Sequence, residues 1–126
     1  MAKVLGVGGV FFKAEDPKAV ADWYARVFGM PAEEWGGVAF PPLPYGVTVW
    51  SPFKADTKYM EPSTQPFMIN LMVDDLDEVL AKALSEGVEA VGRDDSDPNG
   101  RFAWVMDPVG VKIELWEPKA DLPPPP

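Results

Sequence analysis

The fold is decided by a stretch near the end of the chain, where residues 107–118 read Asp-Pro-Val-Gly-Val-Lys-Ile-Glu-Leu-Trp-Glu-Pro. The first four residues predict a tight turn, because proline suits the second position of such a turn and glycine the fourth. Residues 111–117 then predict a β-strand with one apolar face. The last part of the stretch, residues 113–118, has a counterpart 66 residues earlier, where residues 47–52 read Val-Thr-Val-Trp-Ser-Pro.

A second pair of matching segments lies near the start of each half. Residues 9–16 align with residues 68–75 at an offset of 59. An amphipathic helix is predicted after each segment: one from Pro17 to Phe28, closed by Gly29, and one that starts after Asp74-Asp75 and is closed by Gly87. Strands are expected at residues 7–13, 37–40, 45–51, 67–73, 88–91, 102–106 and 111–117. Both halves therefore read β-α-β-β-β, which indicates a duplicated module within one domain.

The composition excludes several classes of chemistry. The chain has 126 residues, enough for one domain with a real core, and contains no cysteine and no histidine. Disulfide scaffolds, thiolate metal sites and cysteine nucleophiles are therefore excluded. The absence of histidine removes the Ser-His-Asp triad, the usual general base near neutral pH and the commonest ligand of transition metals.

The charge is negative and concentrated in the second half. Eleven Lys and Arg against 20 Asp and Glu give a net charge of −9, which disfavours nucleic acid and anionic lipid as partners. The acidic clusters are expected to be solvated faces or helix starts; they are Asp74, Asp75, Asp77 and Glu78, and then Asp94, Asp95 and Asp97. With no signal peptide and no long apolar run, the expectation is a soluble, cytoplasmic protein without a membrane partner.

The alternation along the strands separates two faces. One set is uniformly apolar and is expected to pack under the helices: Val10, Phe12, Val47, Val49, Ile69, Leu71, Val73, Ile113 and Leu115. The other set mixes aromatic, methionine and polar side chains: Gly9, Phe11, Lys13, Thr48, Trp50, Met68, Asn70, Met72, Lys112, Glu114 and Trp116. Such a mixture predicts the lining of a pocket, with a second core layer or a dimer contact as the alternative. The facing of Arg101, Phe102 and Trp104 stays open.

These features resemble the vicinal oxygen chelate superfamily, the glyoxalase, bleomycin-resistance and extradiol dioxygenase group. The resemblance rests on the two modules, on Trp23-Tyr24 in the Gly-closed first helix, and on the 107–110 turn that leads into residues 113–115. It implies an α+β fold in which two tandem βαβββ modules form a curled mixed sheet around a central cavity, with the helices outside, often in a homodimer. The expected organisation is one domain, residues 1–126, with module 1 at 5–53, a linker at 54–66, module 2 at 67–118 and a disordered proline-rich tail at 119–126.

The resemblance also implies where a metal would bind. Metal-dependent members place ligands at the positions that correspond here to Gly9, Thr48, Met68 and Glu114. Glu114 is the one ordinary ligand for a divalent metal among them, since Gly9 has no side chain, Thr48 offers a weak hydroxyl and Met68 a soft thioether. The usual metal site is therefore expected to be lost, and no cofactor is expected.

Glu114 is the candidate catalytic residue, as a general base or as the anchor of a cationic ligand. The alternative is an ion pair with Lys112 or Lys13 that only holds the wall of the pocket. The candidate ligand-binding residues are Phe11, Lys13, Thr48, Trp50, Met68, Asn70, Met72, Lys112 and Trp116. Residues 52–66 are a candidate lid over the cavity.

The leading hypothesis is a metal-free, dimeric protein that binds a small aromatic or cationic molecule. The first alternative is a lyase, isomerase or dioxygenase of the same superfamily that depends on a divalent metal or on Glu114. The second is a structural or interaction module with a filled cavity.

Overall fold

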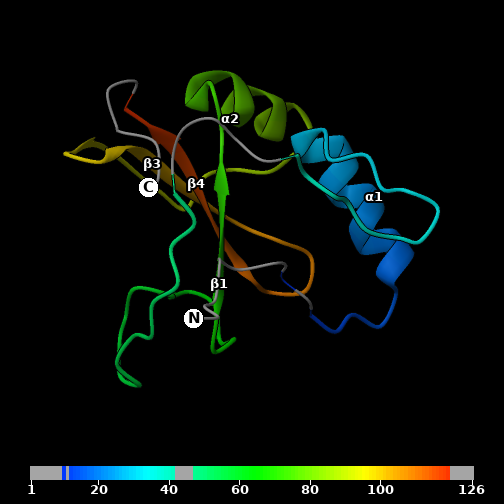
Figure 1. Ribbon diagram of the computed structural model, residues 1–126, viewed down its shortest axis with the longest axis horizontal. Helices are drawn as coiled ribbons and strands as arrows, with labels where there is room; N and C mark the ends of the chain where they lie inside the picture. Colours follow the sequence, from blue (N-terminus) through cyan, green and yellow to red (C-terminus); the bar gives the residue numbers. More distant parts are fainter. Residues whose placement is uncertain (1–9, 11, 42–46, 120–126) are drawn as a thin grey trace, which may run out of the picture.

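The computed structural model describes residues 10, 12–41 and 47–119, and shows an α+β arrangement of two helices and one open, four-stranded mixed sheet. The elements in chain order are α1 (Pro17–Phe28), β1 (Met68–Met72), α2 (Leu76–Ser85), β2 (Gly92–Asp97), β3 (Gly100–Met106) and β4 (Lys112–Pro118). The two helices lie beside each other at one side of the sheet (Figure 1). This confirms the predicted fold class; the curled sheet of two tandem modules stays a prediction.

Both helices start and end as their sequences predict. Asp16 caps α1 by accepting the Ala19 N–H at 3.1 Å, and Pro17 occupies the first turn, where its missing N–H costs nothing. Gly29 ends α1 with φ of 66°, the left-handed conformation that glycine adopts without strain. Asp75 caps α2 in the same way through the Glu78 N–H, so the acidic cluster at residues 74–78 is a helix start.

The sheet has the order β1-β4-β3-β2. β1 pairs with β4 in parallel, and β4 with β3 and β3 with β2 are antiparallel. The predicted turn at 107–110 connects β3 to β4, and the Gly110 N–H donates to the Asp107 carbonyl at 3.2 Å. The prediction of a strand at residues 88–91 is wrong. The strand lies at 92–97, because Gly92, Arg93 and Asp94 are the residues that pair with β3.

The core lies between the helices and one face of the sheet. Val20 and Tyr24 of α1 and Leu76 of α2 pack on alternate residues of β3 and β4, which are Ala103, Val105, Ile113 and Leu115. The alternation predicted for residues 71, 113 and 115 is therefore confirmed, and residue 69 is buried beside its register partner Ile113. The other face of these strands points away from the helices.

The strands expected in the first half are absent from its described residues. Residues 12–13, 37–40 and 47–51 belong to no strand, while 7–9, 11 and 45–46 lie outside the described part of the chain. Val49 is 71% exposed, and Val10, Phe12 and Val47 are exposed as well, so their predicted burial under the helices is wrong. Trp50, predicted to line a pocket, is 78% exposed. An alternating pattern forms a strand only where a neighbouring backbone pairs with it.

A buried hydrogen bond ties the first helix to the second half. The Tyr24 hydroxyl donates to the Asp107 carboxylate at 2.7 Å. The Asp107 carboxylate also accepts hydrogen bonds from the backbone N–H groups of Val109 and Val111. Burial and the Asp107 contact raise the pKa of Tyr24 well above its ordinary value of 10. α1 is thus anchored to the turn that begins β4.

None of the helices in the described part of the chain is long and apolar enough to cross a bilayer.

Candidate functional site

The sheet face opposite the helices carries a row of three aromatic rings. Phe102 and Trp104 of β3 alternate with the core residues of that strand, and Trp116 of β4 lies opposite Phe102 in the register. The Phe102 and Trp116 rings are 6.0 Å apart at an interplanar angle of 5°, and the Phe102 and Trp104 rings are 6.4 Å apart at 14°. We call Trp104, Phe102 and Trp116 the aromatic row; its three rings are nearly parallel and stacked, and together they form an apolar, electron-rich surface that suits an aromatic molecule.

Two glycines make room for the ends of the aromatic row. A Cβ atom on Gly92 would lie 3.2 Å from Cε3 of Trp104, its partner on β3. A Cβ atom on Gly100, where φ is 138°, would collide with the backbone of Glu117 and approach the Trp116 indole nitrogen to 3.1 Å. The indole N–H of Trp116 donates to the Asn99 carbonyl at 3.0 Å, which holds this ring in place.

Glu114 lies beside the row, and its carboxylate accepts hydrogen bonds from three uncharged donors. Asn70 on β1 donates its amide N–H to Oε1 at 2.8 Å, and the Trp104 indole N–H donates to Oε2 at 2.9 Å. The Tyr59 hydroxyl also donates to Oε2. Asn70 and Trp104 are the register partners of Glu114 on either side, so the sheet itself brings the first two donors to the carboxylate. Glu114 is only 8% exposed and is a fixed, buried acceptor.

Lys112 places a positive charge close to this carboxylate without an ion pair to it. Its ammonium nitrogen donates to the Tyr59 backbone carbonyl at 2.5 Å and lies over the rings of Tyr59 and Trp104, 5.2 and 5.4 Å from their centroids. Burial lowers the pKa of Lys112 from its ordinary value of 10.5, while Glu114 and Glu61 act in the opposite direction. The ion pairs formed by the described residues do not include Glu114.

Tyr59 reaches the site from the segment before β1. This segment descends without helix or strand at the side of the sheet away from the helices and then turns back into β1 (Figure 1). The Tyr59 ring meets Trp104 edge-on, with centroids 6.0 Å apart. Burial and the Glu114 contact raise the pKa of Tyr59 well above 10, so its hydroxyl is a proton donor throughout the neutral range.

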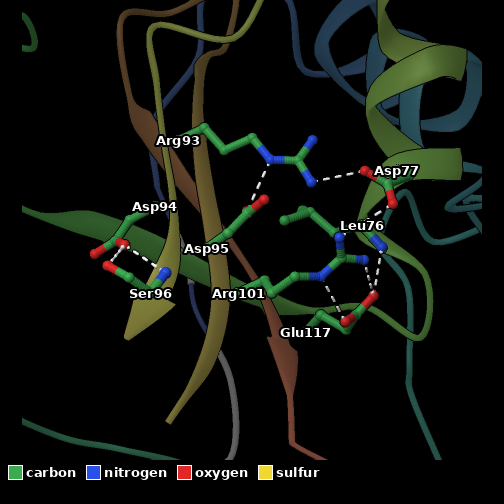
Figure 2. A network of polar contacts seen from close by, with 8 residues as sticks. All are labelled: Leu76, Asp77, Arg93, Asp94, Asp95, Ser96, Arg101 and Glu117. Carbon is green, nitrogen blue, oxygen red and sulfur yellow. Dashed lines mark hydrogen bonds and ion pairs between the residues drawn. The ribbon is translucent and has the colours of Figure 1, made fainter. Parts of the chain in front are cut away.

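The opposite face holds a second polar cluster, formed by charges (Figure 2). Arg101 of β3 donates two hydrogen bonds, of 2.9 and 2.7 Å, to the carboxylate of Glu117 on β4. Glu117 also accepts a hydrogen bond from the backbone N–H of Leu76, at the start of α2. Arg93 and Arg101 both bind Asp77, at 2.6 and 3.1 Å. We call Arg93, Arg101, Asp77 and Glu117 the charged clamp. It borders a shallow hollow of about 540 Å³ lined mainly by acidic side chains.

The charged clamp is a structural device. Arg101 and the Leu76 N–H hold the pKa of Glu117 below its ordinary value of 4.5, and the two arginines hold that of Asp77 below 3.8. Each carboxylate already has its cation, and the contacts join the first turn of α2 to β2, β3 and β4.

The structure gathers part of the residue set predicted from sequence. Asn70, Lys112, Glu114 and Trp116 lie together on the face opposite the helices, and the alternation of β1 places Met68 and Met72 on that face too. Lys13, Thr48 and Trp50 are exposed, and the ring contact of Trp116 is with Phe102 rather than with Trp50. Gly9 and Phe11 lie outside the described residues.

Three residues of the site were not selected from the sequence. The sequence does not determine which face of the sheet Phe102 and Trp104 occupy. The turn at 107–110 and the pairing of β3 with β4 determine it. Tyr59 lies in the linker, where no periodic pattern applies. The sequence marks residues 52–66 as a candidate lid but does not single out Tyr59 among them.

The residues present do not fit the metal site that the resemblance implies. Of the four corresponding positions, Glu114 has its carboxylate engaged by three donors, Met68 offers a thioether and Thr48 is exposed. In the described part of the chain no three His, Cys, Asp or Glu side chains come together as metal ligands. No step through a metal follows from this geometry.

A comparison with protein families matches residues 9–116 to the model of a glyoxalase-like domain. No curated protein matches the chain.

Solved structures provide further likenesses. TioX from Micromonospora sp. ML1 has a TM-score of 0.50 at 19% identity, over 86% of this chain and 93% of its own, which is a likeness of fold. A glyoxalase / bleomycin resistance protein from Catenulispora acidiphila DSM 44928 is 41% identical over 40% of this chain and 45% of its own, with a TM-score of 0.35. A putative glyoxalase family protein from Bacillus anthracis is 25% identical over half of each chain, with a TM-score of 0.39. The chain thus spans about half the length of the last two.

Proposed function

Because the chain belongs to the family of glyoxalase-like domains, we propose that it binds a small planar aromatic molecule on the aromatic row, with Glu114 as the polar anchor. The observation that carries the proposal is the juxtaposition of three nearly parallel rings with a buried carboxylate that is held by uncharged donors. An aromatic ligand gains contact area from the row, and a hydrogen-bond donor on it gains direction from Glu114.

The geometry favours an aromatic ligand over a cationic one. The Lys112 ammonium lies over the Trp104 ring, on the surface that a cation would need. It would repel a second positive charge brought to the same carboxylate. A neutral planar ligand avoids this repulsion and still contacts both the aromatic row and the Glu114 carboxylate.

The proposal includes a cavity, formed when the first module closes over this face, and a homodimer of such chains in the cytoplasm. The support is the sequence repeat between residues 47–52 and 113–118, which predicts that the two halves of the chain are equivalent modules. Sedimentation of the purified protein tests the dimer.

Titration with small aromatic and cationic compounds tests the binding proposal. Indole and benzamide are expected to bind and to change the tryptophan fluorescence, and tetramethylammonium is not. Trp104→Leu removes one ring of the row and should weaken indole binding about 3- to 10-fold, the worth of one aromatic contact. Trp35→Leu is the matched control, because Trp35 is 67% exposed and hydrogen-bonded to Glu33 outside the site. Equal losses in both variants would contradict binding on the aromatic row.

A catalytic role for Glu114 is the second candidate. The observation that favours it is the hydrogen bond from Tyr59 to Glu114, since a carboxylate and a phenol in contact can pass a proton to and from a bound molecule. Incubation of bound compounds followed by mass spectrometry tests it. Conversion by the wild type and its loss in Glu114→Gln with binding retained would establish catalysis; no conversion of any bound compound argues for binding alone.

A further inference from the structure

The strongest unexplained feature of the site is that one residue of the linker satisfies two buried charged groups at once. Tyr59 donates its hydroxyl to Glu114 and accepts the Lys112 ammonium on its backbone carbonyl. Its ring lies against the end of the aromatic row and under the Lys112 ammonium. An aromatic ring, a donor and a carbonyl acceptor are therefore already presented to the site by the chain itself.

Tyr59 is held less firmly than the groups it contacts. It is 41% exposed, whereas Glu114 and Trp116 are 8% and 7% exposed. Its segment has neither helix nor strand. The segment is otherwise held by local turns, by the contact between the Phe53 and Tyr59 rings, and by hydrogen bonds from Ser63 and Gln65 to the carbonyls of Gly110 and Val109. Moving Tyr59 away would break no strand pairing and would leave the hydrogen bonds from Asn70 and Trp104 to Glu114 in place.

The site without Tyr59 has defined chemical needs. Glu114 Oε2 would keep the Trp104 N–H and lose one donor, and the Lys112 ammonium would lose its acceptor. An unpaired buried donor or acceptor weakens binding, so a molecule that replaces Tyr59 without restoring both contacts binds less tightly than one that restores them.

From these contacts we infer that Tyr59 is an internal occupant of the ligand position, and that the ligand is an uncharged aromatic molecule carrying a phenolic O–H donor at one end and a carbonyl acceptor at the other. This inference rests on the proposed function and makes it specific. The ligand's ring lies on the aromatic row, its donor meets Glu114 and its carbonyl meets Lys112. The ligand then binds only when Tyr59 is displaced. Because Tyr59 occupies the ligand position in the free protein, the apparent affinity of the wild type for the ligand is reduced.

Calorimetry with 4-hydroxybenzamide tests the inference, because this compound has the ring, the hydroxyl and the carbonyl. Benzamide is the matched probe without the hydroxyl, and tetramethylammonium the cationic one. Tyr59→Ala is expected to bind 4-hydroxybenzamide about 5-fold or more tightly than the wild type, since no side chain has to be displaced. Tyr59→Phe, which keeps the ring and loses the contact with Glu114, should lie between the two. Glu114→Gln should abolish the preference for 4-hydroxybenzamide over benzamide.

The outcomes separate the inference from the proposed function. Equal affinity of wild type, Tyr59→Phe and Tyr59→Ala for 4-hydroxybenzamide would overturn the internal occupant and leave binding on the row intact. Failure of every aromatic probe with wild type and variants alike would overturn the proposed function and the inference with it. Thermal unfolding checks each variant, and Tyr59→Phe, the milder change, decides the question if Tyr59→Ala does not fold.

Discussion

Glu114 and Glu117 stand on the same strand, β4, and show two ways in which a protein holds a carboxylate. Glu117 faces α2 and is bound by the Arg101 guanidinium and the Leu76 N–H. Glu114 faces the open side and is bound by uncharged groups from Asn70, Trp104 and Tyr59. The first arrangement neutralises the charge and ties a helix to the sheet. The second leaves the charge without an ionic partner, which is what a binding site needs and a structural contact does not.

Of the changes that test this difference, removing the structural carboxylate of Glu117 should have the largest effect on stability. Glu117→Ala removes the two hydrogen bonds of the Arg101 guanidinium to Glu117, leaving the one to Asp77, and leaves the Leu76 N–H unpaired. We expect a loss of about 2 kcal/mol in the free energy of unfolding, measured by urea denaturation, because hydrogen bonds to charged groups are the strong ones. Glu89→Ala, at an exposed glutamate outside the charged clamp, is the control. Equal stability of the two variants would show that the clamp does not hold α2.

Acid should dismantle the charged clamp through the same residue. Arg101 holds the pKa of Glu117 below its ordinary value of 4.5 in the folded protein. The stabilisation is therefore fully present above about pH 4.5 and is lost as the pH falls through the lower, folded value. Melting temperatures recorded from pH 6 to 3 should fall less steeply for Glu117→Gln than for the wild type. Parallel curves would contradict this role.

A charge placed beside Glu114 should reverse the direction of that pH effect. Asn70→Asp puts a second carboxylate where the amide now donates at 2.8 Å. Repulsion should lower the free energy of unfolding by about 1 kcal/mol at neutral pH, and acidification should restore it when one of the two groups takes up a proton. Asn70→Ala, which removes the donor and adds no charge, should show no such recovery. Identical pH profiles of the two variants would mean that the carboxylates do not interact.

The smallest effect is expected far from both carboxylates. Lys18 and Asp22 form an ion pair of 2.8 Å on the exposed side of α1. Lys18→Gln should leave the melting temperature unchanged within error, because exposed pairs of this kind are screened by solvent. A loss as large as that of Glu117→Ala would show that the partial burial of the Arg101–Glu117 pair does not set it apart from an exposed ion pair.

Local sequence signals predicted the parts of the fold that depend on local interactions. Asp16, Gly29 and the turn at 107–110 determine helix ends and a hairpin within a few residues, and the alternation of β1 and β4 determines which face meets the helices. β2 is different: residues 92–97 are mostly polar, and they form a strand because β3 lies beside them. The period-2 pattern at 47–51 pairs with no strand in the described part of the chain.

The site was predictable to the same extent. Asn70, Lys112, Glu114 and Trp116 follow from the alternation of two strands, so the sequence was sufficient to select them. Tyr59 reaches Glu114 from 55 positions earlier in the chain, through a segment without regular structure. No repeat or periodicity encodes such a contact, since it depends on how the linker crosses the sheet.

The glycine at position 92 has a consequence for how this surface could change. A methyl group there would lie 3.2 Å from the Trp104 ring, tighter than side chains ordinarily tolerate, so the indole would have to tilt. Every larger residue would tilt it further and alter the angle at which its N–H meets Glu114. Because Gly92 is the register partner of Trp104 and lies beside it on the same face of the sheet, a substitution there would change the orientation of the Trp104 ring, and with it the selectivity of the aromatic row, without replacing any residue of the row or any donor to Glu114.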